Sequence, residues 1–454
     1  MSRNPIQHPL SRRHVLAGAS ALAGGLLLPG TAPAQGGGKP FAGVTLNVSL
    51  FNAPFARILT KWLPEFEAQT GARVVFDTPS FPVYNQRADL ELSTGGAAYD
   101  VLNITFIYSS RWISAGWFTP LDEFIRDPNK TAPDWGVDDF LPGLRAVETD
   151  KAGRLYGIPW TVDTFVSGAA RFDLFQAAGL ALPDTTDALL SALTTLKAAH
   201  GKDKIAGFIT DNHYGWTFVP FLQAFGGQVF RGPPDDLTPV FSSPEGVAAA
   251  EYFARLLKEF GPNGVLSYTE DQVVQSLQNG RSNYTALGQT YLSQLGGAAS
   301  KTASSAAYGP VVKGPAGRFP GVATHALGIP AASKNKDAAW AFIQWALSKK
   351  NTRRAIVEER YASPTRRSDF DSPDFKEITR LNGYDLADII ASSVELAARQ
   401  GHMAYRTVPV YPQVDQQFNK AIANIVSGQL SAKQALEQAQ ANSITELKRA
   451  GVAL

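Results

Sequence analysis

The chain contains no cysteine among its 454 residues. This absence excludes disulfide bonds, thiolate metal sites and a cysteine nucleophile, and it also excludes a lipid-anchored N-terminus, which needs a thiol to acylate. The six histidines are scattered without HxxxH spacing, so we expect no dedicated metal site and no cofactor. Stability must therefore come from the packing of hydrophobic cores.

An excess of charge of one sign is also missing, because the chain has 42 lysines and arginines against 40 aspartates and glutamates. Arg3, Arg12 and Arg13 lie in the first 34 residues, which carry no acidic residue, so 39 basic and 40 acidic residues remain beyond them. A nucleic-acid-binding protein shows clustered lysine and arginine and a strong positive balance. We therefore expect no nucleic-acid partner.

The N-terminal hydrophobic run is too short to span a bilayer. Residues 15–28 are apolar and rich in glycine and alanine, but a spanning helix needs ~20 such residues. Arg12 and Arg13 precede this run, and Ala32-Pro33-Ala34 supplies a small-x-small cleavage site after it. This order predicts a twin-arginine signal peptide over residues 1–34 and a mature protein that is periplasmic and free of a membrane anchor. We also expect the mature protein to be a monomer. The alternative is a disordered N-terminus with a chance arginine pair.

Beyond the signal peptide, the 420 residues from 35 to 454 suffice for two lobes of roughly 200 residues, each the size of one hydrophobic core. Hydrophobic periodicity then predicts strands alternating with helices, which indicates a parallel sheet with helices on both faces. The expected strands are 44–50, 73–77 and 99–104, and the expected helices are 55–69 and 83–93. Ligands bind at the carboxyl ends of such strands. The candidate residues there are Phe51, Asn52, Ser80, Phe81, Tyr84, Thr105 and Tyr108.

The second half of the chain repeats this alternation. A helix over 186–200, a strand over 205–209 and a strand over 283–287 are expected, with polar and aromatic loops after both strands. Ser243 is expected to cap a helix over 245–260, and Thr269 with Gln272 forms a capping box. The two loops add the candidates Asp211, Tyr214, Trp216, Gly288, Gln289 and Tyr291.

The segment 154–180 carries the strongest functional signal and reads RLYGIPWTVDTFVSGAARFDLFQAAGL. Its pattern predicts strands over 155–159 and 165–170, joined by a short connection that contains Trp160, Thr161 and Asp163. An aromatic ring beside a carboxylate and hydroxyls offers a sugar one apolar face and several hydrogen bonds. The segment resembles the YGIP(Y/F)xxDxxxxxYRxDLFexAGL block of family 1 extracellular solute-binding proteins, the receptors of carbohydrate-type ABC importers.

Two more segments resemble this family in the expected order. Residues 322–335, VATHALGIPAASKN, are similar to its G(G)xxxxIPxxSKN motif and precede a helix expected over 337–347. Residues 361–366, YASPTR, are similar to its Gly/Ala-x-Pro-x-Arg turn, and the C-terminal region then continues as helices. These segments add Thr324, His325 and Arg366 as candidates. The chain departs from the family at Ala170, where a tyrosine is usual, and in its twin-arginine export route.

The resemblance implies an α/β, type II-like, two-lobed periplasmic binding protein fold, in which each lobe is a mainly parallel sheet flanked by helices. It places the N-terminal lobe at 40–159 and 326–362 and the C-terminal lobe at 160–325 and 363–454, with three crossings between them. Such lobes close by hinge motion around a ligand. The implied function is capture of a neutral sugar, oligosaccharide or polyol and its delivery to a membrane permease, without chemical change.

Other interpretations of these residues stay open. Trp160 and His325 could be core residues, Asp163 could cap a turn, and Arg366 could brace the third crossing through a carboxylate. Arg366 and Arg406 would suit a receptor for an anionic ligand such as a glycerophosphodiester. A secreted carbohydrate hydrolase or lyase needs two carboxylates facing each other at ~5 to 10 Å, and only Asp163 and Asp211 are acidic among the candidates.

Overall fold

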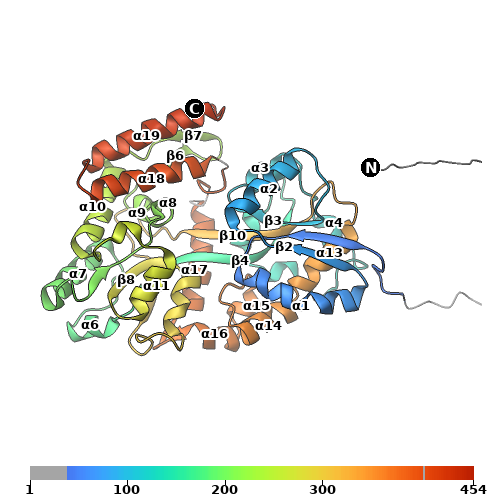
Figure 1. Ribbon diagram of the computed structural model, residues 1–454, viewed down its shortest axis with the longest axis horizontal. Helices are drawn as coiled ribbons and strands as arrows, with labels where there is room; N and C mark the ends of the chain where they lie inside the picture. Colours follow the sequence, from blue (N-terminus) through green and yellow to red (C-terminus); the bar gives the residue numbers. More distant parts are fainter. Residues whose placement is uncertain (1–37, 402–403, 409) are drawn as a thin grey trace, which may run out of the picture. The chain divides into compact units, whose positions relative to one another are not determined.

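The computed structural model describes residues 38–401, 404–408 and 410–454, so the predicted signal peptide over 1–34 lies outside the described residues. Within them, eight strands are joined by hydrogen bonds along the path β2-β1-β3-β10-β4-β8-β5, with β9 paired to β4 (Figure 1). No helix in these ranges combines the length and apolar character that a membrane crossing needs.

The N-terminal lobe is built from the strand and helix alternation expected from the sequence. The strands β1 (Thr45–Ser49), β2 (Arg73–Asp77) and β3 (Val101–Thr105) are parallel, and α1 (Pro54–Thr70) and α2 (Phe81–Ser93) connect them. The helix α13 (Lys336–Ala346) buries Trp340 and Ile343 in the same core as β1 and α1. Shorter helices complete the lobe: α3 (Ser109–Ser114), α4 (Asp122–Arg126) and α5 (Pro142–Val147).

The first crossing differs from the sequence prediction. Residues 157–169 form one continuous strand, β4 (Gly157–Ala169), so the expected connection around Trp160 and Asp163 is wrong. The first half of β4 is antiparallel to β10 (Val322–Gly328), which also pairs with β3. Its second half is antiparallel to β8 (Ser282–Gly288) and β9 (Ala307–Pro310). Because β10 and β8 pair with β4 on both sides of these polar residues, a strand replaces the loop that local polarity suggested.

The third crossing lies beside β4 and is tied to it by side chains. The hydroxyls of Ser363 and Thr365 donate to the carbonyls of Val162 and Pro159 at 2.7 and 2.8 Å. The hydroxyl of Tyr361 donates to another β4 carbonyl at 3.3 Å. These bonds attach the segment to the strand without a sheet ladder. The strands on either side of these crossings belong to separate hydrophobic cores, which gives the structure two lobes. The residue boundaries predicted for the lobes remain a prediction.

The C-terminal lobe packs helices around β5 (Ala206–Phe208) and β8. Both predicted caps are confirmed: Ser243 accepts from the Gly246 amide at the start of α10, and Thr269 with Gln272 forms a capping box. The loops predicted over 211–216 and 288–291 instead contain the short helices α8 (Tyr214–Thr217) and α12 (Gln289–Leu292). The elements are α6 (Phe172–Ala177), α7 (Thr186–His200), α8 (Tyr214–Thr217), α9 (Val219–Ala224), β6 (Phe230–Gly232), β7 (Asp236–Pro239), α10 (Pro244–Arg255), α11 (Glu270–Gln278) and α12 (Gln289–Leu292).

The C-terminal region is helical, as expected. Figure 1 shows α18 (Tyr411–Val426) and α19 (Ala432–Arg449) side by side, and both contribute to the core that contains Phe218 and Phe253. A separate core joins α17 (Leu386–Gln400) to Val162 and Val166 of β4. The remaining elements are α14 (Lys349–Glu359), α15 (Arg367–Phe370), α16 (Pro373–Thr379), β11 (Arg380–Leu381) and β12 (Tyr384–Asp385).

Candidate functional site

A cavity of about 330 Å³ lies where β4 and β10 cross between the two lobes. Strand β4 supplies every second residue to it, Thr161, Asp163 and Phe165, because side chains alternate between the two faces of a strand. Strand β10 does the same with Ala323 and His325. The other lining residues are Phe51, Ala53, Pro54, Phe81, Phe106, Asp211, His213, Trp216, Glu270, Leu287, Gly288, Thr290 and Tyr291.

The cavity brings together part of the predicted site. The predicted residues that line it are Phe51, Phe81, Thr161, Asp163, Asp211, Trp216, Gly288, Tyr291 and His325. Sequence reasoning missed Phe106, although it directly follows β3 and the strand-end rule could have found it. It also missed Glu270, which faces His213 from a segment 57 residues away. No local signal could have linked those two residues.

Trp160 and Tyr84 lie in the N-terminal core instead of the cavity. Trp160 is 1% exposed, and its indole nitrogen donates to Asn103 Oδ1 at 2.8 Å. The Tyr84 hydroxyl donates to the Asn103 carbonyl at 2.6 Å. Trp160 and Thr161 are neighbours on one strand and therefore face opposite sides of it. The Trp160 ring supports Phe51 from behind, with ring centroids 5.4 Å apart.

Five other predicted residues lie outside the cavity lining. Asn52 accepts a hydrogen bond from Arg57, Tyr108 stacks on Trp112, and Thr324 donates to the Thr161 carbonyl at 3.1 Å. Ser80 stands at the N-terminus of α2. Thr105 is fully buried at the end of β3.

Gln289 and Arg366 brace the crossings, and Tyr214 is packed separately in the core that contains Phe253. The Gln289 amide nitrogen donates to the Val162 carbonyl at 2.6 Å and to the Ser363 hydroxyl at 3.0 Å. The Arg366 guanidinium is fully buried and donates to the Leu347 carbonyl at 2.8 Å and to Asp139 Oδ2 at 3.2 Å. Tyr214 is 2% exposed. None of these three side chains lines the cavity.

The C-terminal lobe gives the cavity an acidic wall. Asp163 Oδ1 accepts a hydrogen bond from the Thr290 hydroxyl at 3.1 Å. Burial raises the pKa of Asp163 to about 6, although the bonds from Thr290 oppose this shift. Burial and the neighbouring charge of Glu270 raise the pKa of Asp211 to about 8. These carboxylates can accept hydrogen bonds from ligand hydroxyl groups.

His213 joins Asp211 and Glu270 in this wall. Its Nδ1 lies 3.3 Å from Glu270 Oε1 and 3.9 Å from Asp211 Oδ2. The bond to Glu270 is the main cause that raises the pKa of His213, to about 9. Three candidate ligand atoms of these residues lie within 4.8 Å of one another, a spacing that a metal ion could also use. The expected lack of a metal site therefore stays a prediction.

The opposite wall is aromatic and comes mainly from the N-terminal lobe. The ring centroids of Phe51, Phe106 and Phe81 lie 4.6, 5.3 and 5.6 Å from that of His325. Trp216 reaches this wall from the other lobe, with its centroid 5.3 Å from Phe106. The guanidinium of Arg406 lies 3.9 Å from the Trp216 centroid and outside the cavity lining. The site thus offers aromatic faces on one side and hydrogen-bond acceptors on the other.

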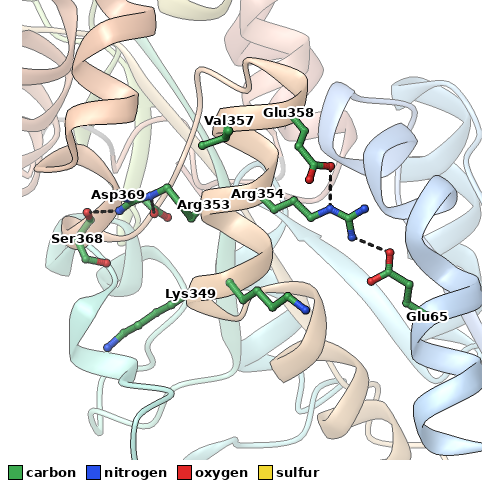
Figure 2. Close-up of a pocket in the computed structure, with 9 residues that line it drawn as sticks. Glu65, Lys349, Arg353, Arg354, Val357, Glu358, Ser368 and Asp369 are labelled. Carbon is green, nitrogen blue, oxygen red and sulfur yellow. Dashed lines mark hydrogen bonds and ion pairs between the residues drawn. The ribbon is translucent and has the colours of Figure 1, made fainter.

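A second depression, of about 820 Å³, lies beside α14 and has a different character (Figure 2). Arg354 lies between Glu65 and Glu358, at 2.7 and 2.8 Å. Arg353 pairs with Asp369 at 3.2 Å. Its lining contains no aromatic residue, and these arginines already have carboxylate partners. It therefore lacks the stacking surfaces that suit a sugar.

Comparison with known proteins identifies the family. The model of the family "Bacterial extracellular solute-binding protein" matches residues 51–353. The chain is 25% identical over 388 residues to the mannitol-binding protein of Pseudomonas aeruginosa, covering 81% of this chain and 85% of that protein. It is 24% identical over 412 residues to the erythritol/L-threitol-binding protein of Mycolicibacterium smegmatis, covering 83% and 85%.

Solved structures agree with the fold. A solute-binding protein of an ABC transporter from Agrobacterium radiobacter, in complex with ribitol, has a TM-score of 0.73 at 24% identity and covers 89% of this chain and 99% of its own. One from Agrobacterium vitis, with bound D-mannitol, has a TM-score of 0.72 at 24% identity and covers 90% and 99%. The chain belongs to the family of bacterial extracellular solute-binding proteins, and its fold is the two-lobed fold of that family.

Proposed function

We propose that this protein is a periplasmic receptor that binds a neutral polyol or small sugar between its lobes and delivers it, chemically unchanged, to the permease of an ABC importer. The observation that carries the proposal is the pairing of an aromatic wall with a carboxylate wall in one cavity between the lobes. Carbon-bound hydrogens of a polyol pack on the rings, while its hydroxyls donate to Asp163, Asp211 and Glu270.

The size of the cavity favours a single small unit over an oligosaccharide. Its volume of about 330 Å³ lies at the lower end of the ~300 to 1,000 Å³ that small-molecule pockets span. The relatives and solved structures named above carry mannitol, erythritol or threitol, and ribitol in their descriptions, all of which are acyclic polyols.

The charges of the lining argue against an anionic ligand. Among the described residues that line the cavity there is no lysine or arginine. The Arg366 guanidinium already donates to a backbone carbonyl and to Asp139, and the Arg406 guanidinium packs on the Trp216 ring. A phosphodiester would face the carboxylates of Asp163 and Glu270, and the one cationic side chain of the described lining, His213, is already paired with Glu270 at 3.3 Å, which is unfavourable.

The geometry also supports capture by closure. Phe51, Phe81 and His325 contact the cavity from one side of the crossings, and Asp211 and Glu270 contact it from the other. A ligand that touches both walls binds best when the lobes are closed, and it therefore shifts the population toward that state. Export by the twin-arginine route, a monomeric state and the permease partner belong to this proposal as well.

Thermal shift and calorimetry on residues 35–454 test the proposal, with D-mannitol, ribitol, erythritol, maltose and glycerophosphocholine as probes. We expect a polyol to raise the melting temperature, because a ligand at about 100 times its Kd stabilises the native state by about 2.7 kcal/mol. Trp216→Ala should weaken binding at least tenfold. Trp345→Ala is the matched control, since Trp345 is also half-buried but lies on α13 against Phe66.

Two results would contradict the proposal. A response to glycerophosphocholine alone would indicate a receptor for a glycerophosphodiester. Chemical conversion of the probe during incubation, measured by chromatography, would indicate an enzyme. The family consists of binding proteins, and the absence of catalysis in this chain remains a prediction that the chromatography tests directly.

A further inference from the structure

His325 occupies a singular position in the aromatic wall. The cavity residues that come from the N-terminal lobe and β10 are Phe51, Ala53, Pro54, Phe81, Phe106, Ala323 and His325. Within this described set, His325 is the one polar side chain. Every side-chain hydrogen bond that this wall can make to a ligand must therefore come from its imidazole ring.

The imidazole is buried without a protein partner. His325 is 8% exposed, and its Nδ1 has no hydrogen-bond partner among the described residues. A buried nitrogen that lacks a partner has a free-energy cost, and a phenylalanine would pack against the three surrounding rings without that cost. The cost is removed only when a group from outside the chain supplies the missing hydrogen bond.

The register between β10 and β4 sets the position of the His325 side chain. The ladder between β10 and β4 shifts register between His325 and Ala326, so that His325 is opposite Thr161 while Ala326 is opposite Pro159. Such a bulge leaves one residue, here Trp160, without a partner in the ladder. His325 and Thr161 are paired across the ladder and share the cavity, while Trp160 lies on the opposite face of β4, in the core.

Burial lowers the pKa of His325 to about 3, so the ring is neutral at physiological pH. A neutral imidazole has one N–H donor and one acceptor nitrogen. A hydroxyl group can partner either nitrogen, because it both donates and accepts hydrogen bonds. An ammonium group only donates, and a carboxylate only accepts.

We propose that His325 is a specificity-determining residue that hydrogen-bonds one particular hydroxyl of the bound polyol and so selects against ligands that lack it. This proposal rests on the proposed function, because it assigns the recognition of one hydroxyl within the same cavity. A polar site in an apolar wall rejects an analogue that lacks its hydrogen-bonding group, since the polar atom is then left unpaired.

Calorimetry with D-mannitol, ribitol and their monodeoxy analogues tests the proposal. For wild type we expect one deoxy position to cost about tenfold to a hundredfold in Kd. In His325→Phe that one penalty should fall to about threefold or less, while the penalties at the other positions stay. His325→Gln keeps a donor and an acceptor and should retain part of the discrimination. Phe106→Leu, a change in the same wall, should weaken parent and analogues equally.

The outcomes separate the two proposals. If wild type binds a polyol but His325→Phe leaves the pattern of deoxy penalties unchanged, the role of His325 is overturned and the receptor function stands. If wild type binds none of these probes, the receptor function fails and this proposal fails with it. Selective ¹⁵N labelling of histidine gives a readout on the wild-type fold, since the His325 nitrogens must shift when D-mannitol binds.

Discussion

A Cβ atom on Gly288 would lie 2.4 Å from Oδ2 of Asp163, closer than any two such atoms approach. Gly288 ends β8, and its φ of −57° suits any residue, so the backbone conformation does not require glycine here. Glycine is required because the Asp163 carboxylate occupies the space that a Cβ atom would take. This close approach places Asp163 where it accepts from Thr290 and faces the cavity.

The first prediction concerns Gly288→Ala. The new methyl group must displace the Asp163 carboxylate, and we expect ligand Kd to rise at least tenfold with a stability loss of about 1 to 3 kcal/mol. Gly232→Ala is the control, because a Cβ there meets Asp236 at an ordinary 3.6 Å. Calorimetry and urea unfolding measure the two effects. Wild-type affinity in Gly288→Ala would show that the position of Asp163 does not matter for binding.

The second prediction concerns pH and Asp163. Its folded pKa of about 6 lies above the ~3.9 of an unfolded aspartate, so the native state holds a proton that the unfolded state has lost. Its contribution to stability is full below pH ~4 and is lost as pH rises through 6. Asp163→Asn should therefore be more stable than wild type by about 3 kcal/mol at pH 8 and equal to it near pH 4.

The same variant separates stability from binding. The carboxylate accepts hydroxyl hydrogen bonds more strongly than an amide oxygen does, so Asp163→Asn should bind a polyol about tenfold more weakly at pH 8. Thermal melts and calorimetry at pH 4, 6 and 8 check both effects. A variant that is less stable than wild type at pH 8 would contradict the assignment of a raised pKa.

The third prediction concerns Glu148, which is fully buried and has no hydrogen-bond partner for either carboxylate oxygen among the described residues. Burial raises its pKa well above the usual value, so stability falls as pH rises above ~4.5 toward the folded pKa. Glu148→Met removes this titration and should raise the melting temperature at pH 8 by about 3 °C or more.

Glu437→Gln, an exposed position on α19, is the control and should leave the pH dependence of melting unchanged. The measurement is a series of thermal melts from pH 5 to 9. If Glu148→Met melts with the same pH slope as wild type, the carboxyl group is ionised in the folded protein and the prediction is wrong.

The fourth prediction concerns the third crossing. The Val162 carbonyl accepts from both Ser363 and Gln289, whereas among side chains Thr365 alone donates to the Pro159 carbonyl in the described structure. Ser363→Ala should therefore cost about 0.5 to 1 kcal/mol of stability, and Thr365→Val about 1 to 3 kcal/mol.

Urea unfolding followed by tryptophan fluorescence measures these costs. Thr445→Val on α19 is the control, because its exposed hydroxyl donates to the Ala441 carbonyl at 2.9 Å within one helix. If Ser363→Ala costs as much stability as Thr365→Val or more, the hydrogen bond from Gln289 to the Val162 carbonyl does not compensate for the lost Ser363 hydroxyl, and the prediction is wrong.

Interactions between near neighbours were predictable. The caps at Ser243 and Thr269 join residues three positions apart, and hydrophobic periodicity located α7 over 186–200 and β2 over 73–77. The strand-end rule also placed Phe51 and Phe81 at the cavity. In each case the deciding contacts lie within a few residues, or at the ends of neighbouring parallel strands.

The prediction failed where a partner strand decides the outcome. Polar residues at 161, 163 and 164 suggested a connection, but β10 and β8 supply the ladders that hold β4 extended through them. Once the strand is continuous, its alternation sends Thr161 and Asp163 to the cavity and Trp160 to the core. The aromatic residue with the strongest sequence signal is thus a support for Phe51 and not a cavity residue.

The sequence by itself determined the family, the alternation of strands and helices, and the local caps, because these depend on short-range periodicity and on motifs. Only the tertiary structure decided which polar groups face the cavity. His213 meets Glu270 across 57 residues, Asp163 fits against the distant Gly288, and the register between β10 and β4 sets His325 opposite Thr161. Such pairings follow from the register between distant strands, which no local pattern of residues encodes.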